Sequence, residues 1–129
     1  MTIEELNKIS GIILDSAIEV HKQLGPGLLE SVYEFCLFKE LRSRNLFVER
    51  QVPVPVVYKG EDLNADFRID LLVEHEIIIE LKAVEIILPV HEAQLLTYLK
   101  LAEKRLGLLI NFNVPKLVSG FKRMLNGYL

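Results

Sequence analysis

The segment that decides the fold spans residues 66–82 and reads D-F-R-I-D-L-L-V-E-H-E-I-I-I-E-L-K. It holds two runs of mostly branched apolar side chains, residues 69–73 and 77–81, on either side of a polar tip at residues 74–76. Apolar runs of this length around a short polar tip are typical of a β-hairpin. Because successive side chains of a strand point to opposite faces, the length of the tip decides which residues meet across the hairpin.

A tip of three residues pairs Val73 with Ile77 and so places Asp70 directly opposite Glu80. Lys82 then lies on the same face, two residues after Glu80. Cross-strand neighbours of this kind stand roughly 5 Å apart at Cβ. A tip of two residues would move one carboxylate to the other face. The sequence therefore predicts two carboxylates and a lysine close together on one face of the sheet.

Two carboxylates on an apolar sheet face repel each other and need a partner. A hard divalent cation provides one, because Mg²⁺ is held by one or two carboxylates together with water and substrate phosphate. Asp70 and Glu80 are therefore candidate metal ligands, and the main-chain carbonyl of Leu81 is a further candidate. The alternative interpretation is that Glu80 and Lys82 form an ion pair on the surface of an edge strand.

The composition is that of a globular chain, since 50% of the 129 residues are hydrophobic and 26% are charged. This length predicts a single domain, residues 1–129. The net charge of −3 argues against a general nucleic-acid coat, for which a basic stripe is expected. The single cysteine, Cys36, gives no disulfide framework and indicates a reducing cytosol. No apolar run approaches the roughly 18 residues of a membrane span and no signal-peptide pattern is present, so we expect a cytoplasmic protein without a membrane partner.

The N-terminal third predicts two helices. Thr2 and Glu5 match a capping box, and helical spacing of apolar residues continues to about residue 23. A glycine–proline–glycine run at residues 25–27 ends this helix, and a second helix spans about residues 28–44. The core stripe expected for the second helix is Leu29, Val32, Phe35, Cys36 and Leu41, while Glu30, Tyr33 and Leu37 form another stripe.

The rest of the chain predicts a small mixed sheet flanked by helices. Residues 47–58 form an extended stretch whose two prolines suit an edge strand, and residues 59–62 form a turn before the hairpin. A third helix follows at about residues 90–101, then an apolar strand at Leu106–Asn111 and a last amphipathic helix at about residues 118–125. The predicted order is α-α-β-β-β-α-β-α, a mixed α/β fold.

Four short motifs lie along this order. They are Asp70, the tripeptide Glu80-Leu81-Lys82, a G-x-x-E-x-x-Y pattern at residues 27–33 and a Q-x-x-x-Y pattern at residues 94–98. Asp70 with the tripeptide resembles the core of the PD-(D/E)XK nuclease superfamily, which has a restriction-endonuclease-like fold. The second pattern resembles the GxxExxY family of small bacterial and archaeal proteins within it, and the third is similar to a motif of the RecB-like and phage-exonuclease branches. The resemblance covers almost the whole chain, although Arg68-Ile69-Asp70 stands where the namesake Pro-Asp would be.

The resemblance implies a nuclease that uses Mg²⁺ or Mn²⁺. It implies that Asp70 and Glu80 hold the metal, and that Lys82 orients the attacking water or stabilises the developing phosphate charge. It also implies that Glu30, from the second helix, completes the acidic cluster directly or through water. A carboxylate such as Glu30 equally has a purely structural explanation, because the helix dipole favours it in the first turn by roughly 0.3–1 kcal/mol.

The remaining residues that the resemblance implies come from the helices. Gln94 positions a ligand or Lys82, and Tyr98 supports Gln94 from one turn below. Tyr33 is a supporting residue, and without the resemblance it is a half-buried packing residue whose hydroxyl finds a partner.

Three interpretations of function remain open. The first is a metal-dependent phosphodiesterase acting on DNA or RNA, structure-specific rather than sequence-specific, at ends, flaps or junctions. The second is a non-catalytic nucleic-acid- or protein-binding module on the same fold, and the third is an inert domain with coincidental spacing. The acidic net charge indicates a narrow substrate or an unknown protein partner that delivers it. A homodimer is also expected, because the C-terminal segment is rich in apolar residues: Phe121, Met124, Leu125, Tyr128 and Leu129.

Overall fold

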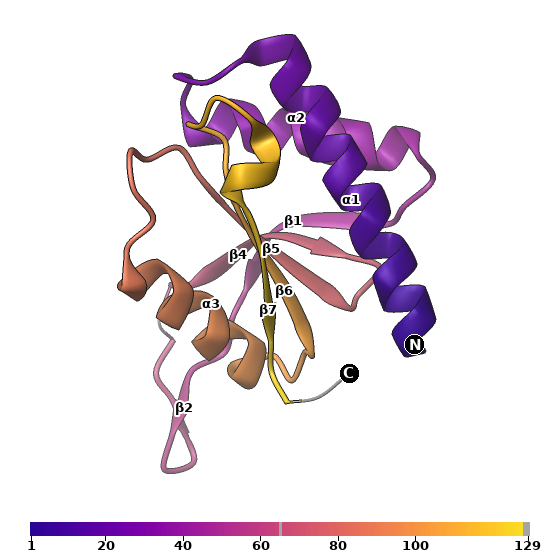
Figure 1. Cartoon of the computed structure of the whole chain (residues 1–129). Coiled ribbons are helices and arrows are strands. Elements are labelled where there is room, and N and C mark those ends of the chain that lie inside the picture. The colour runs from indigo at the N-terminus through magenta and orange to yellow at the C-terminus, as the bar shows by residue number, and fades with distance from the viewer. Residues whose placement is uncertain (65, 128–129) are drawn as a thin grey trace.

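The computed structural model describes residues 1–64 and 66–127, in which three α-helices pack against a five-stranded sheet (Figure 1). The sheet has the strand order β1-β4-β5-β6-β7, and β2 and β3 form a separate short hairpin. The predicted mixed α/β fold is therefore confirmed. The elements are α1 (Ile3–Leu24), α2 (Glu30–Ser43), β1 (Val48–Pro53), β2 (Val57–Tyr58), β3 (Glu61–Asp62), β4 (Arg68–Val73), β5 (Ile77–Lys82), α3 (Pro89–Leu101), β6 (Leu106–Asn111), the 3-10 turn η1 (Leu117–Gly120) and β7 (Phe121–Leu125).

Two apolar layers hold the helices on opposite faces of the sheet (Figure 1). On one face, α1 and α2 cover the odd-numbered residues of β5, and on the other α3 covers Ile78 and Leu109 with Leu95 and Leu99. Burying apolar side chains on both faces stabilises the fold by roughly 25 cal/mol per Å² removed from water. Because β5 and β6 lie in the middle of the sheet, even the polar side chains at their ends are shielded from solvent.

The central hairpin has the predicted register. Val73 pairs with Ile77 and Leu71 with Ile79, so the tip has three residues, and Glu74 and His75 have positive φ angles of 52° and 58°. β1 extends this hairpin as a third antiparallel strand. β6 then adds next to β5 in parallel orientation, as expected for a strand that follows a crossover helix.

The predicted last helix is wrong. Residues 121–125 form strand β7, which pairs antiparallel with β6 from Leu106↔Leu125 to Ile110↔Phe121. Five residues fit either a helical or a strand period, and the free edge of β6 decides between them. Gly120, directly before β7, approaches the main-chain carbonyl of Asn111 so closely that a side chain there would collide with it.

The core stripe predicted for α2 is wrong at Leu29, Val32 and Phe35, whereas Leu41 is buried as predicted and Cys36 packs against the core. The buried residues of this helix are Tyr33, Glu34, Leu37 and Leu41, whereas Val32 and Phe35 are exposed. The turn before α2 sets this rotation, because the Tyr33 hydroxyl donates to the Gly25 carbonyl at 2.6 Å and accepts the Leu28 N–H at 3.1 Å. The Tyr33 ring also stacks on Phe112, with ring centroids 4.5 Å apart. Tyr33 therefore anchors the turn from α1 to α2.

Glycine is required at the first position of the G-x-x-E-x-x-Y pattern for a backbone reason. Gly27 has a φ of 96°, a conformation that residues other than glycine rarely adopt.

At the other end of the chain, the expected dimer residues Tyr128 and Leu129 lie outside the described residues. In the described part, no helix is both long enough and apolar enough to cross a membrane.

Candidate active site

The candidate site lies where β4 and β5 separate. Pairing between these strands stops at Leu71 and Ile79, although β5 stays paired with β6 as far as Lys82. On the other side of β4, the pairing with β1 is interrupted at Asp70. Gln51 of β1 would face Asp70, but its φ of 51° takes it out of the extended conformation. The ladder hydrogen bonds are therefore interrupted around Asp70, and its main chain is free to bind side chains.

The carboxylates of Asp70 and Glu80 take the place of those ladder bonds. The Asp70 carboxylate accepts a hydrogen bond from the Leu81 N–H at 2.8 Å, and the Glu80 carboxylate accepts one from the Asp70 N–H at 3.3 Å. Each carboxylate is thus held by the main chain of the opposite strand. The two carboxylates that sequence reasoning placed face to face are brought together in the structure.

Burial makes this pair unfavourable without a partner. Glu80 is 5% exposed, and its pKa rises to about 9, first because of burial and then because of the nearby Asp70 charge. The ammonium of the half-buried Lys82 acts in the opposite direction and lowers the pKa of Glu80. Asp70, Glu80 and Lys82 therefore share one electrostatic environment, in which a further positive charge would be stabilising.

The donor set fits a hard divalent cation. No group of three or more His, Cys, Asp or Glu side chains that could hold a metal occurs within residues 1–64 and 66–127. A cluster of three is not needed, because Mg²⁺ is usually bound by one or two carboxylates with water and substrate phosphates. Asp70 and Glu80 provide two oxygen-donating carboxylates on adjacent strands, and the main chain of Leu81 lies beside them.

Glu30 does not join the pair by a direct contact. It is the first residue of α2 and is exposed, and its side chain forms no hydrogen bond or ion pair with the described residues. Its position at a helix N-terminus matches the structural explanation given above.

Glu34, one turn later on α2, was missed by sequence reasoning. It is 8% exposed and accepts hydrogen bonds from Gln51 at 2.7 Å and from Arg50 at 3.2 Å. Its pKa is raised mainly by burial and then by the charge of Asp70, so Glu34 lies within electrostatic reach of the pair. The sequence pattern that indicates Glu34 is its position three residues before Leu37, which places both on the buried face of the helix.

Helix α3 contributes Tyr98 from the opposite layer. Tyr98 is 6% exposed, and its pKa is raised by burial and then by the charges of Glu80 and Asp70. Gln94, one turn earlier, is half-buried and lines an apolar hollow; it forms no side-chain hydrogen bond with the described residues. His91 serves a local purpose, since its Nδ1 accepts the Leu88 N–H at 3.0 Å and caps the helix.

Asn111 fixes the segment that leaves the site after Lys82. It is 3% exposed, and its amide donates to the Val84 carbonyl at 2.9 Å and accepts the Val84 N–H at 3.1 Å. The same oxygen accepts the Asn113 N–H at 3.1 Å. Asn111 lies beside Lys82 in the parallel register of β5 and β6, so this amide links the strand ends on both sides of the site.

We expect Asn111→Ala to lower the free energy of unfolding by roughly 2–4 kcal/mol, because three main-chain groups lose a partner in a buried setting. Urea unfolding followed by circular dichroism measures this change. Asn7→Ala is the matched control, since Asn7 is exposed and accepts a hydrogen bond from Arg123 on the surface, and it is expected to change stability by less than about 1 kcal/mol. Equal stability of the Asn111 variant and the wild type would contradict a stabilising role of the buried Asn111 amide.

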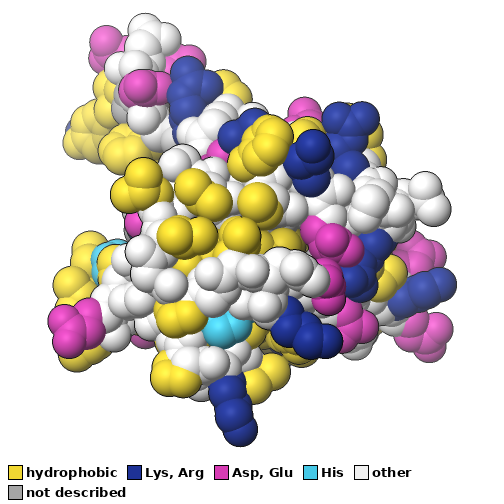
Figure 2. All heavy atoms as spheres, turned by 90° about the horizontal axis from the view of Figure 1, so that it is seen from above, with side chains coloured by type: hydrophobic (Ala, Val, Ile, Leu, Met, Phe, Trp, Pro, Cys, Tyr) yellow, Lys and Arg dark blue, Asp and Glu magenta, His cyan; other side chains and the backbone are white. Residues whose placement is uncertain are grey.

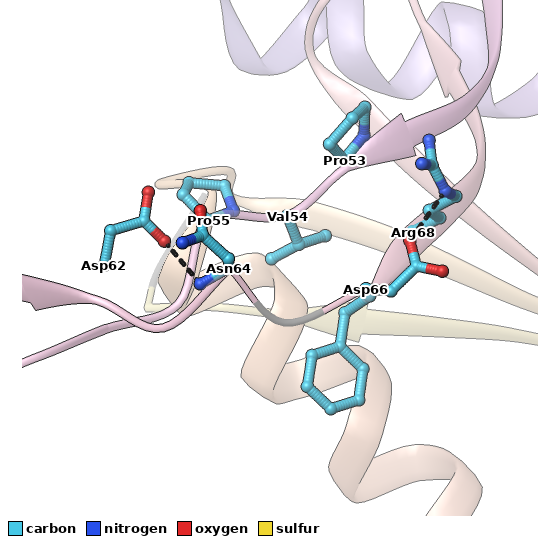
Figure 3. A pocket seen from close by; sticks show the side chains of 8 residues that line it. Pro53, Val54, Pro55, Asp62, Asn64, Asp66 and Arg68 are labelled. Carbon is cyan, nitrogen blue, oxygen red and sulfur yellow. Dashed lines mark hydrogen bonds and ion pairs between the residues drawn. The ribbon is translucent and has the colours of Figure 1, made fainter.

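A polar hollow of about 460 Å³ lies beside β4, between the Pro53–Pro55 segment and the β2–β3 hairpin (Figure 3). Its side chains largely bind one another: Arg68 pairs with Asp66 at 3.1 Å, and Asp62 accepts the Asn64 N–H at 2.9 Å (Figure 3). The Arg68 guanidinium also donates to the Gln51 carbonyl. The hollow therefore offers no arrangement comparable to the carboxylate pair.

Comparison with known protein families shows which family the chain resembles. The family model of the PD-(D/E)XK nuclease superfamily matches residues 7–124, a range that includes every candidate residue described above. No curated protein and no solved structure matches the chain. Nucleases of this superfamily usually use divalent metals and act on nucleic acids. The match spans most of the sequence and agrees with the fold, so the chain belongs to the PD-(D/E)XK nuclease superfamily.

Proposed function

We propose that this chain is a divalent-metal-dependent nuclease that hydrolyses phosphodiester bonds of DNA or RNA at ends, flaps or junctions. The observation that carries this proposal is the pairing of the Asp70 and Glu80 carboxylates where β4 and β5 separate, with the Lys82 ammonium acting on Glu80. Membership of the superfamily supports a nucleic-acid substrate.

In this proposal Asp70, Glu80 and the main-chain carbonyl of Leu81 bind Mg²⁺ or Mn²⁺. The bound cation supplies Lewis-acid activation of water and phosphate. Lys82 projects from the same face of β5 as Glu80, where its ammonium orients the attacking water or stabilises the phosphate charge. Gln94 positions a ligand or Lys82, and Tyr98 supports it from the next turn of α3.

From α2, Glu34 is in a better position than Glu30 to assist the pair. Glu34 is buried and lies within electrostatic reach of Asp70, whereas Glu30 is exposed at the start of the helix. We therefore propose that Glu34, through its hydrogen bonds with Arg50 and Gln51, fixes the part of β1 that faces Asp70. Glu30 would reach the site only through water. The G-x-x-E-x-x-Y pattern, with Tyr33 anchoring its turn, supports placing the chain in the GxxExxY family.

We also propose that residues 1–129 act as a single cytoplasmic domain. A homodimer is proposed through the exposed edge of β7, because the other edge strand of the sheet, β1, ends at a proline that cannot donate to a new strand. Light scattering at micromolar protein should give twice the mass of one chain. A monomeric mass would contradict the dimer without bearing on the nuclease site.

The experiment that tests the function is cleavage of labelled single-stranded, duplex, flapped and branched DNA, and of RNA, with Mn²⁺ and with chelator. Wild type is expected to cleave at least one of these substrates, with chelator and Asp70→Asn each abolishing cleavage. Asp15→Asn is the matched control, because Asp15 is exposed on α1. Cleavage that persists with chelator, or that is equal in Asp70→Asn, would contradict the proposal.

A non-catalytic binding module is the second candidate, and exposed apolar side chains favour it. Hydrophobic side chains gather near the middle of one face of the molecule (Figure 2). In the turn between α1 and α2 and in the segment after β5, Leu29 is 73% exposed and Ile86 is 68% exposed. Exposed apolar side chains of this kind suit a protein partner, and such a partner would also explain how an acidic nuclease receives its substrate.

A further inference from the structure

An apolar hollow of about 370 Å³ lies between α3 and the segment that leads into β4. None of the described residues that line it carries a formal charge at neutral pH, and Gln94, Thr97 and Tyr98 provide its polar groups. Its volume lies at the low end of the roughly 300–1,000 Å³ that small-molecule sites span. The residues that line the hollow are Val56, Phe67, Val90, Ala93, Gln94, Thr97, Tyr98 and Leu101.

Tyr98 links the hollow to the strands that carry the carboxylate pair, because it packs in one apolar cluster with Ile69, next to Asp70 on β4, and with Ile78, two residues before Glu80 on β5. Tyr98 lines the hollow, and the charges of Glu80 and Asp70 both act on its hydroxyl and raise its pKa. From the strand side, Phe67 lines the hollow and precedes Asp70 by three residues along the chain. The hollow therefore lies next to the strand segments that carry the two carboxylates.

The hollow contains one exposed aromatic ring, that of Phe67, on which a planar group can stack. Phe67 is 45% exposed although it is large and apolar, and its ring centroid lies 6.3 Å from that of Tyr98, with the planes tilted by 57°. Phe67 also lines the polar hollow of Figure 3, so this side chain separates an uncharged site from a charged one. A base stacked on an aromatic side chain contributes roughly 1–3 kcal/mol of binding.

We propose that this hollow is a subsite for one unpaired nucleobase of the strand whose phosphate lies at Asp70 and Glu80. The proposal rests on the nuclease function proposed above and narrows its substrate to single-stranded or flapped nucleic acid. A base inside a duplex is stacked and paired, so it cannot enter the hollow without being extruded. The uncharged lining excludes a phosphate, and the Gln94 amide and Thr97 hydroxyl offer hydrogen bonds to a base edge.

In a basic protein, contacts with phosphates dominate the binding of nucleic acid. This chain has a net charge of −3, so base stacking is expected to contribute a larger share of the binding energy.

A second copy of the chain is the other possible occupant of an apolar hollow. The experiment below separates the two, because a base contact depends on the oligonucleotide and a protein contact depends on protein concentration.

The test is fluorescence anisotropy of a short labelled single strand at low salt with chelator present, so that no cleavage occurs. Phe67→Ala is expected to weaken binding by about tenfold, and Phe67→Trp to remain within about threefold of wild type, since stacking is kept. Phe47→Ala is the matched control and should bind as wild type does, because Phe47 is 52% exposed but packs on His75 outside the hollow.

A second arm replaces single bases of the strand by abasic positions. An abasic site at one position of the strand should weaken binding to the wild-type protein as much as Phe67→Ala does. The Phe67→Ala protein should bind this abasic strand no more weakly than the wild type does, as expected when both changes remove the same contact. Weaker binding with Phe67→Ala in the absence of any cleavage would support the subsite and count against the nuclease function. Chelator-sensitive cleavage with unchanged binding by Phe67→Ala would overturn the subsite and leave the nuclease function standing. A dimer that dissociates with Phe67→Ala would overturn the subsite in favour of a second copy.

Discussion

Replacing Lys82 with alanine is expected to lower the rate of strand cleavage by at least about 100-fold, the scale of losing an electrostatic contact made in the transition state. Lys82 is half-buried, and its ammonium already acts on Glu80 at the end of β5. The substitution leaves the two carboxylates and their main-chain hydrogen bonds unchanged, so fold and metal binding should be retained.

The measurement is the single-turnover cleavage rate with Mn²⁺, together with calorimetric metal binding and circular dichroism for each variant. Lys82→Arg should recover cleavage only in part, because a planar guanidinium does not reproduce the compact charge of an ammonium. Lys8→Ala is the matched control, since Lys8 is exposed on α1. A Lys82→Ala protein that cleaves at the wild-type rate would remove Lys82 from the proposed chemistry.

Replacing Glu80 with glutamine is expected to stabilise the metal-free protein at pH 8 while abolishing cleavage. In the folded chain the pKa of Glu80 is raised to about 9 from its ordinary value of 4.5, so the folded state binds a proton more tightly than the unfolded state. Its contribution to stability is fully present below about pH 4.5 and is lost as the pH rises toward about 9. At pH 8 the difference between Glu80→Gln and wild type should be on the order of 3 kcal/mol.

Urea or thermal unfolding with chelator, between pH 5 and pH 9, measures this difference. The two proteins should unfold alike near pH 5 and diverge as the pH rises, and Mn²⁺ should then stabilise wild type but not Glu80→Gln. Glu61→Gln is the control, because Glu61 is exposed in the β2–β3 hairpin and should follow wild type at every pH. Parallel stability curves for wild type and Glu80→Gln would show that burial does not suppress the ionisation of Glu80.

Local pattern was sufficient to predict the centre of the fold. The register of β4 and β5 follows from a three-residue tip and a period of two, and the wholly buried strand β6 has the predicted bounds. The first helix begins as its capping pattern indicates, with the Thr2 hydroxyl accepting the Glu5 N–H at 3.1 Å. In each case the residues that decide the structure are neighbours along the chain.

The errors arose where a distant part of the chain decides the structure. The segment at residues 121–125 fits a helix or a strand by itself, and its pairing with β6 selects the strand. The rotation of α2 depends on Tyr33 reaching back to Gly25 and stacking on Phe112, which is remote in sequence. The contact of Glu34 with Gln51 depends in turn on that rotation, so periodicity alone pointed to the wrong face of the helix.

Calorimetric titration of wild type and Asp70→Ala with Mn²⁺ tests the metal site at Asp70 and Glu80 most directly. Wild type should bind one ion and release about one proton at pH 7, because Glu80 must lose the proton that its raised pKa retains in the metal-free protein. Titrations in two buffers of different ionisation enthalpy count that proton, and Asp70→Ala should show no binding. A wild-type protein that binds no ion, or an Asp70→Ala protein that binds it with equal affinity, would contradict a metal site at this pair.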